Sequence, residues 1–131
     1  MIKNKLIIVL IVIFLPLASI SQTKSDDANP IYHYLDLDET PKLLSGESIQ
    51  KYINKKVYWP EGFHGDGKVY ISFVIDKDGN CKDPVIIKSI YKKCDDLSLE
   101  IINSMPKLKP GVLKGNNVNT LIITHVDFTV Y

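Results

Sequence analysis

Residues 67–79 read Gly-Lys-Val-Tyr-Ile-Ser-Phe-Val-Ile-Asp-Lys-Asp-Gly, and this stretch decides the fold. Every second residue from 69 to 75 is apolar: Val69, Ile71, Phe73 and Ile75. That period is typical of a β-strand with one buried face. The following Asp76 to Gly79 step supplies side-chain acceptors and a glycine able to adopt positive φ, as a short hairpin loop needs. A second apolar run, Val85 to Ile90, comes next, so the stretch predicts a β-hairpin.

Two helical segments lie on either side of the hairpin in the sequence. Between Ser45 and Lys56, the apolar residues fall at i, i+3 and i+4, which predicts a helix of about three turns with one buried face: Ile49, Tyr52 and Ile53. The second segment, Asp95 to Met105, begins with two acidic residues that favour a helix N-terminus. Its apolar face consists of Leu97, Ile101, Ile102 and Met105, and Pro106 is expected to end it.

The end of the chain predicts one long strand. Lys107 to Asn117 contains Pro110, Gly111 and Gly115 and is expected to be a loop. From Val118 to Val130 the even positions read Val, Thr, Ile, Thr, Val, Phe and Val, which indicates an inward apolar face. The sequence therefore predicts an α+β fold in which a small three-stranded antiparallel sheet packs against two helices.

In their order and spacing, these pieces resemble the TonB C-terminal domain. The resemblance runs from about Asp38 to Phe128, and no single piece of it is specific. It is carried by Tyr58-Trp59-Pro60-Glu61, by residues 67–79 and by Met105-Pro106-Lys107-Leu108-Lys109-Pro110-Gly111. The resemblance implies a non-enzymatic binding module, without a cofactor, that passes mechanical work drawn from the proton gradient at the inner membrane to outer-membrane receptors.

The first 21 residues are expected to be a removable signal peptide. Lys3 and Lys5 precede an apolar run from Leu6 to Leu17, and small polar residues follow before Gln22, where cleavage is expected. This predicts a periplasmic or secreted protein. The alternative is an uncleaved anchor in the inner membrane that faces the periplasm, although a spanning helix needs roughly 20 apolar residues.

After the signal peptide, we divide the chain into a polar tether at residues 22–40 and a TonB C-terminal-like domain at residues 41–131. Removal of Lys3 and Lys5 reduces sixteen basic residues to fourteen against fifteen acidic ones, a net charge of −1. All basic residues are lysine, so the bidentate phosphate contacts of arginine are missing. Nucleic acid is therefore not an expected partner.

The resemblance also places the partner-binding site. In the family, a receptor's N-terminal box segment is thought to add as a strand beside the last strand, whose edge presents main-chain donors and acceptors. The candidate residues there are Val126, Asp127, Phe128, Thr129 and Val130. The step Tyr58, Trp59 and Pro60 matches a tyrosine-proline step near that site. Trp59 can either bury a large area against a partner or cover the core beneath the first helix.

Two cysteines in an exported chain raise the question of a disulfide. If Cys81 to Ile90 is continuous strand, its nine steps span about 30 Å. The four residues back to Cys94 recover at most about 14 Å, which leaves more than the roughly 7 Å Cα separation that a bridge allows. Geometry therefore predicts two free thiols, with a break at Pro84 as the alternative that permits a bridge. Relatives often carry a cysteine at the position of Cys94, which favours a packed thiol there.

The sequence shows no pattern of an active site or a metal site. His33, His64 and His125 are scattered, and His125 with Asp127 on one strand face is typical of a surface pair. The aspartates of the hairpin turn lack the spacing and the twelfth-position glutamate of an EF-hand loop.

Two functions therefore remain. The first is a periplasmic adaptor that binds the peptide of an outer-membrane TonB-dependent receptor, with inner-membrane motor proteins as further partners if the chain is anchored. The second is a periplasmic interaction or structural module that reuses the fold without energy transduction and docks through Trp59 or a sheet face. The exposed sheet edges also allow a homodimer.

Overall fold

The computed structural model describes residues 29–129, and the predicted signal peptide and its cleavage position lie outside them. From Ile31 onward the chain forms one α+β unit. Its main sheet has five strands: β1 (Ile31–His33), β3 (Lys68–Ile75), β4 (Cys81–Lys88), β6 (Gly111–Leu113) and β7 (Asn116–Asp127). A second sheet has two: β2 (Lys42–Leu43) and β5 (Leu108–Lys109).

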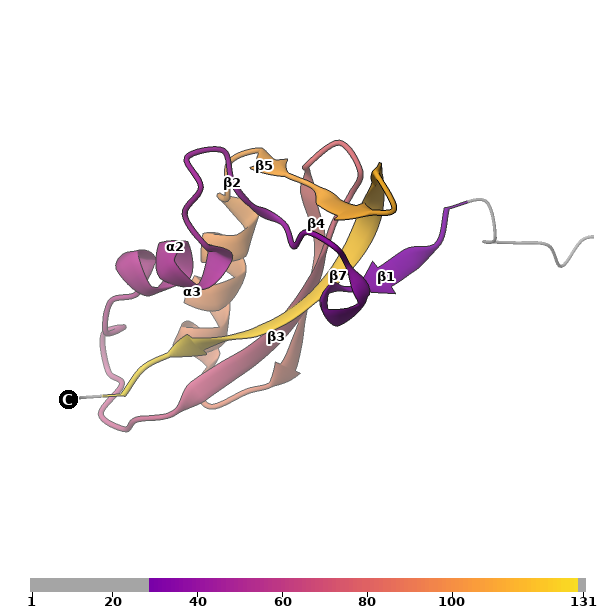
Figure 1. The fold of residues 1–131 in the computed structure, drawn as a ribbon. Coiled ribbons are helices and arrows are strands. Elements are labelled where there is room, and N and C mark those ends of the chain that lie inside the picture. The colour runs from indigo at the N-terminus through magenta and orange to yellow at the C-terminus, as the bar shows by residue number, and fades with distance from the viewer. Residues whose placement is uncertain (1–28, 130–131) are drawn as a thin grey trace, which may run out of the picture. The chain divides into compact units, whose positions relative to one another are not determined.

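The main sheet is larger than predicted and mixed in direction. Its order is β1-β7-β3-β4, with β6 paired to the beginning of β7. β7 is antiparallel to β3 and β6, whereas β1 runs parallel to it and pairs Tyr32 with Thr120. The α+β class with two helices is confirmed, but the prediction of a three-stranded antiparallel sheet is wrong. Figure 1 shows β1 beside β7 at one edge of the sheet.

The extra strands come from segments whose sequences carry no strand pattern of their own. β1 and the 3-10 helix η1 (Tyr34–Asp36) lie in the segment that we assigned to the tether, and β5 and β6 lie in the predicted 107–117 loop. Each strand is only two or three residues long, too short for a period to be recognised. β6 pairs with residues 116–118, where the twelve-residue β7 extends beyond β3. β1 pairs with β7 at residues 119–121, and β5 pairs with β2.

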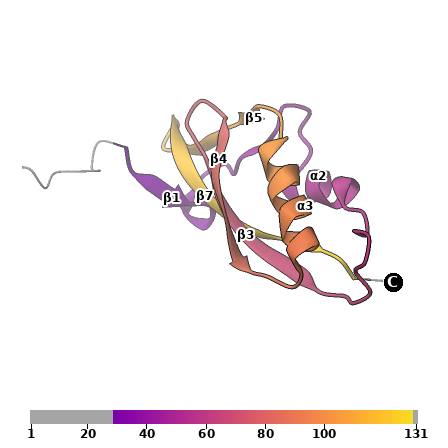
Figure 2. The ribbon, with the colours of Figure 1, turned by 180° about the vertical axis from the view of Figure 1, so that it is seen from behind.

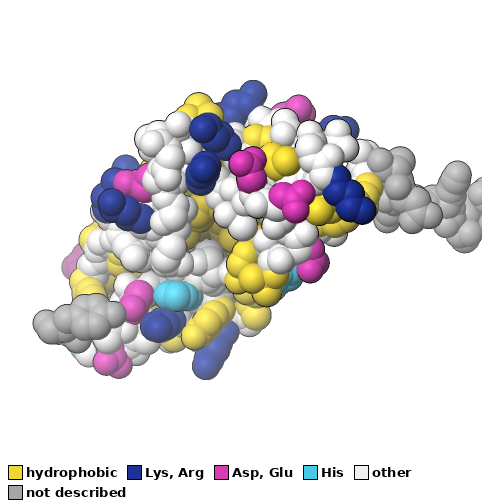
Figure 3. Space-filling model, viewed as in Figure 1, with side chains coloured by type: hydrophobic (Ala, Val, Ile, Leu, Met, Phe, Trp, Pro, Cys, Tyr) yellow, Lys and Arg dark blue, Asp and Glu magenta, His cyan; other side chains and the backbone are white. Residues whose placement is uncertain are grey.

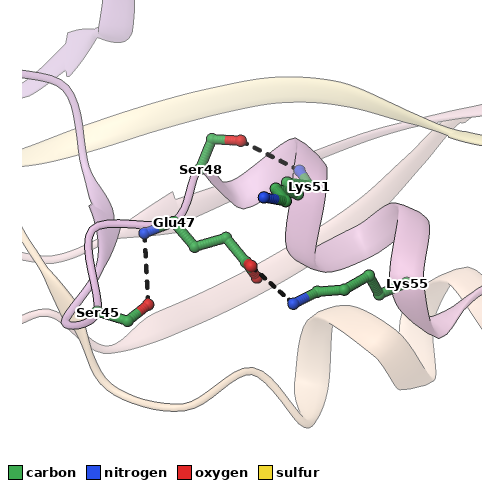
Figure 4. Close-up of polar contacts among 5 residues, drawn as sticks. All are labelled: Ser45, Glu47, Ser48, Lys51 and Lys55. Carbon is green, nitrogen blue, oxygen red and sulfur yellow. Dashed lines mark hydrogen bonds and ion pairs between the residues drawn. The ribbon is translucent and has the colours of Figure 1, made fainter.

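Helix α2 (Ile49–Lys56) begins later than predicted because Ser48 caps it. The Ser48 Oγ accepts a hydrogen bond from the Lys51 N–H at 3.2 Å, which satisfies one of the free donors of the first turn (Figure 4). Before the cap, Ser45 Oγ accepts from the Glu47 N–H, and Glu47 pairs with Lys55 at 2.6 Å. The residues before Ser48 therefore form a turn instead of helix.

Helix α3 (Lys92–Asn103) begins one turn earlier than predicted. Asp95 and Asp96 do not cap it. The N-cap is Tyr91, whose side chain makes no capping bond, while Asp95 lies in the first turn and accepts a hydrogen bond from the Ser89 hydroxyl. A carboxylate in the first turn still interacts favourably with the helix dipole.

Both helices cover the same face of the sheet, with α3 over β3 and β4 and α2 beside β7 (Figures 1 and 2). The core lies between these layers and contains the predicted inward residues of β3, which are fully buried, together with Ile122 and Val126 of β7 and Phe128 directly after it. Ile53 of α2 and Ile101 of α3 complete it from the helix side. The predicted apolar faces of strand and helix are confirmed here.

The hairpin turn has the predicted chemistry. Asp76 Oδ1 accepts hydrogen bonds from the Asp78 and Asn80 N–H groups, both at 2.9 Å, and Gly79 has φ +89°. Burial by itself raises the pKa of Asp76, but the hydrogen bonds from Asn80 and Asp78 and the charge of Lys82 outweigh it, so the pKa lies below its ordinary value. The Gly79 carbonyl also accepts from the Leu108 N–H, which joins the turn to β5.

Cys81 and Cys94 both carry free thiols, and Cys94 is fully buried in the core, as the family resemblance favours. The backbone at Asp83, just before Pro84, has φ +56° and lies where the register between β3 and β4 shifts. The strand is thus irregular where we considered a break. Neither helix within residues 29–129 has the length and apolar composition that crossing a membrane requires.

Candidate functional site: the open side of β7

One side of β7 pairs with β3 along eight residues, and the other side is only partly covered. On this second side β1 pairs with residues 119–121, whereas β6 pairs with residues 116–118, before the ladder with β3 begins. Beyond Leu121, no strand within the described part of the chain pairs with β7 on the side away from β3. We call the stretch Ile122–Asp127 the open edge. It is the position at which an extended peptide can extend a sheet.

The hydrogen-bond register fixes which residues of the open edge point outward. Phe128 N donates to the Gly67 carbonyl at 2.8 Å, which makes these two residues a hydrogen-bonded pair. Antiparallel ladders alternate hydrogen-bonded and non-hydrogen-bonded pairs, so the even-numbered residues of β7 bond to β3. The odd-numbered residues direct their main-chain groups to the open side: Ile123, His125 and Asp127.

Gln50 of α2 already bonds to this side of β7. Its Nε2 donates to the His125 carbonyl at 3.1 Å and to Asn54 Oδ1 at 2.9 Å, and its Oε1 accepts from the Thr124 hydroxyl. A carboxamide has the same donor and acceptor as a peptide group. Gln50 therefore takes the place at His125 that one peptide group of an added strand would take.

The predicted site residues at the end of β7 divide between core and surface. Val126 and Phe128 are fully buried, and the register directs their main chains to the β3 side. Asp127 and Thr129 are half-buried, and Asp127 Oδ1 accepts from the Thr129 N–H at 2.9 Å and from its hydroxyl. Val130 lies outside the described residues.

Trp59 and Phe128 are brought together by the fold. Their ring centroids lie 6.4 Å apart in an edge-to-face arrangement, and Phe63 contacts both rings, with centroid distances of 5.9 Å from Trp59 and 6.1 Å from Phe128. Trp59 thus covers one end of the core while 39% of it stays exposed. Both interpretations of Trp59, as a cover of the core and as a contact surface, are compatible with this position.

Tyr58 and Pro60 lie differently from Trp59. Pro60 is buried, whereas Tyr58 is 61% exposed. Both line a surface hollow whose other wall belongs to α3, including Lys93 and Glu100. Of the three residues in the tyrosine-proline step, only Trp59 has a ring contact with Phe128, directly after β7, among the ring pairs of the described chain.

The histidines are separated from one another in the fold. His33 stacks on Tyr34 at a centroid distance of 4.7 Å, and the His125 ring lies 6.0 Å from that of Tyr70 on the face of the sheet away from the helices. His64 is exposed. Within residues 29–129, no three His, Cys, Asp or Glu side chains gather as a metal ion would require.

The sheet face opposite the helices exposes apolar side chains. Tyr70 of β3 is 37% exposed, Val85 of β4 56% and Ile123 of β7 41%. The register pairs Ser72 with both Val85 and Ile123, so these two side chains lie on one face of the sheet. A partner that covers a sheet face would bury these groups.

Reasoning from sequence did not find Gln50, β1 or the exact limits of the open edge. The glutamine lies on a helix whose pattern indicates only a polar exposed face, and its partner is a main-chain carbonyl 75 residues away. No residue type signals such a contact.

Comparison of the chain with curated proteins and with solved structures finds no match in either group. The model of one protein family, described as Gram-negative bacterial TonB protein C-terminal, does match, at residues 64–130. The match covers just over half of the 131 residues and includes β3, β4, α3 and the whole of β7. With this sheet and its long last strand, the chain belongs to the TonB C-terminal family.

Proposed function

We propose that this domain binds an extended segment of an outer-membrane receptor, which adds as a strand along the open edge of β7. The family has a TonB-like role in envelope transport, is non-enzymatic and interacts with outer-membrane receptors in general. The observation that carries the proposal is the side of β7 beyond Leu121, which no described strand covers. Just before it, β1 pairs on the same side in the parallel direction, which supports the addition of a further strand along this edge.

The residues proposed for the contact follow from the register. Ile123 offers its main-chain N–H and carbonyl on the open side, His125 directs its N–H there while its carbonyl bonds to Gln50, and Asp127 lies farther along. Beyond them, Thr129 and Val130 continue the chain, and Trp59 flanks the strand end through its contact with Phe128. Tyr58 and Pro60 form the adjoining surface. A receptor segment longer than the open edge would reach these aromatic side chains.

Replacement of Ile123 by proline tests the proposal. Proline deletes the N–H that faces the open side and leaves the ladder to β3 intact, as proline on a sheet edge is tolerated. The matched control Ile123→Thr keeps the N–H and the β-propensity. The probe is a synthetic peptide with the N-terminal sequence of an outer-membrane receptor from the same bacterium, and amide resonances of the ¹⁵N-labelled protein are followed during titration.

We expect the wild type and Ile123→Thr to show shifted resonances along residues 121–127, and Ile123→Pro to show none while its other resonances stay dispersed. Peptide binding by a folded Ile123→Pro variant with unchanged affinity would overturn the strand-addition proposal. Val126→Pro is unsuitable for this test, because the Val126 N–H faces β3 and its loss would disrupt the sheet.

We also propose that residues 1–21 are removed before Gln22 and that the mature protein is periplasmic, as domains of this family are. The alternative is an inner-membrane anchor facing the periplasm, with motor proteins as further partners. The intact mass of the native protein from soluble and membrane fractions decides between them. A soluble species that begins at Gln22 supports cleavage, and a membrane-bound species with Met1 contradicts it.

A second candidate function rests on the exposed sheet face with Tyr70, Val85 and Ile123. Large apolar side chains that share a surface often mark a protein interface. A module that docks through this face would need no open edge. In the same titration, shifts at Tyr70 and Val85 without shifts along the open edge would favour this function.

A further inference from the structure

A hollow lies directly beside the open edge of β7. It has a volume of about 270 Å³ and is lined by residues from four places: Tyr34 of η1, Pro41 before β2, Ile49 and Gln50 of α2, and Ile122 and Thr124 of β7. Ile123 and Thr40 complete the lining. Figure 3 shows a hollow near the middle of this face of the molecule with hydrophobic side chains beside it.

The chemistry of the lining favours an apolar guest. None of the described residues that line the hollow is Asp, Glu, Lys or His. The lining combines the large side chains of Tyr34, Pro41, Ile49, Ile122 and Ile123 with the uncharged polar residues Thr40, Gln50 and Thr124. An unpaired charge placed there would lose its hydration without a partner. An apolar cavity of about 150 Å³ already accepts benzene, so this volume suits an aliphatic or aromatic side chain.

The register places the hollow where a side chain of an added strand would point. Ile122 is buried toward the helices, so even-numbered residues of β7 present their side chains on the helix side. A residue directly opposite Ile122 or Thr124 on an added strand projects to the same side. That side chain would enter the hollow between α2 and η1.

Two features of this chain bound the site along β7. At one end β1 pairs His33 with Leu121, and at Tyr34 the chain leaves the edge into η1. At the other end, Gln50 bonds to the His125 carbonyl. The interval between Leu121 and His125 is therefore the part of the edge that neither β1 nor Gln50 occupies, and the hollow lies beside that interval.

We propose that this hollow is a specificity pocket that accepts one uncharged apolar side chain of the receptor segment added at the open edge. The inference rests on the proposed strand addition and adds a requirement on the peptide's sequence. A peptide with Leu or Phe at the position opposite Ile122 or Thr124 binds, and one with Asp there does not. Binding at the open edge thus requires an extended peptide backbone along its length and an apolar side chain at one position of the peptide.

The test uses the full-length protein and three synthetic heptapeptides, acetyl-Ser-Thr-Thr-X-Thr-Thr-Ser-amide, in which X is Leu, Asp or Gly. Dissociation constants are obtained from amide shifts along residues 121–127. The protein variant Thr40→Phe places a ring in the hollow from an exposed position, and the matched control Thr40→Val changes the chemistry of Thr40 with little change in size. Thermal unfolding and resonance dispersion confirm that both variants fold.

We expect the Leu peptide to bind about tenfold or more tightly than the Asp and Gly peptides. Thr40→Phe should abolish this preference, and Thr40→Val should keep it. Edge shifts with equal affinity for all three peptides would overturn the pocket while leaving strand addition in place. If neither these peptides nor the receptor-derived peptide shifts the edge, strand addition itself fails, and the pocket with it.

Discussion

Gly79 shows most directly how one residue supports this fold. It closes the β3–β4 turn at φ +89°, is buried, and its carbonyl accepts the Leu108 N–H at 2.9 Å. A Cβ at this position would overlap the Leu108 carbonyl oxygen. Glycine is therefore needed both for the backbone conformation and for the close approach of β5.

We predict that Gly79→Ala lowers the free energy of unfolding by about 2 kcal/mol or more, because a strained conformation is combined with a backbone clash. Gly115→Ala is the matched control. Gly115 also has positive φ, +82°, but an added Cβ would have no atom within 4 Å, so its loss should be about 1 kcal/mol. Urea denaturation measures both. Equal losses would show that the contact with Leu108 contributes nothing.

At the scale of elements, short α2 supports the site, because it supplies Ile49 and Gln50 to the hollow and the open edge. Eight residues form a marginal helix in isolation, so its position depends on its cap and its buried face. Ile53 is fully buried, and Ser48 satisfies a first-turn donor. A displaced α2 would remove Gln50 from His125.

We predict that Ser48→Ala destabilises the domain by about 1 kcal/mol through loss of the N-cap bond. Ser45→Ala removes the hydroxyl of an exposed turn residue whose bond to Glu47 is longer, 3.3 Å, and it should cost less (Figure 4). Thermal unfolding compares the two variants. In the Ser48→Ala spectrum, the His125 and Thr124 resonances should shift as well; if they do not, α2 stays in place without its cap.

At the scale of the whole molecule, Cys94 lies in the core, the half-buried Cys81 packs against that core, and no bond joins the two thiols. Burial raises the pKa of Cys81 to about 12, and burial together with the neighbouring Asp95 charge raises the pKa of Cys94. Since the thiolate is the reactive form, both cysteines are protected from alkylation in the folded protein.

We predict that iodoacetamide at pH 8 labels the folded protein at least about a hundredfold more slowly than the urea-unfolded chain, because the thiolate fraction falls roughly tenfold for each unit that the pKa rises above the solution pH. Intact mass spectrometry counts the labels, with two expected in urea. Rapid labelling in native buffer would contradict the buried positions. A native species two hydrogens lighter that resists labelling in urea would show that the cysteines form a disulfide.

By itself, the sequence determined the hairpin, the two amphipathic helices and the inward face of β7, since each of these depends on a local period of two or 3.6 residues or on local turn chemistry. Phe73 in the strand period, Gly79 in the turn and Ile101 in the helix period are examples of residues whose place in the fold follows from their sequence neighbours. Their order along the chain was also enough to identify the family.

Only the tertiary structure decided which side of β7 is open and what borders it. β1 and β6 reach β7 through main-chain hydrogen bonds, which any residue can make and which leave no pattern in the sequence. Gln50 bonds through its side-chain amide to a main-chain carbonyl 75 residues away, a contact that local periodicity does not indicate. The hollow beside Ile122 exists because α2 and η1 approach the edge from distant parts of the chain. Local periodicity fixes which face of an element is buried, whereas contacts between elements fix which edge of the sheet remains accessible.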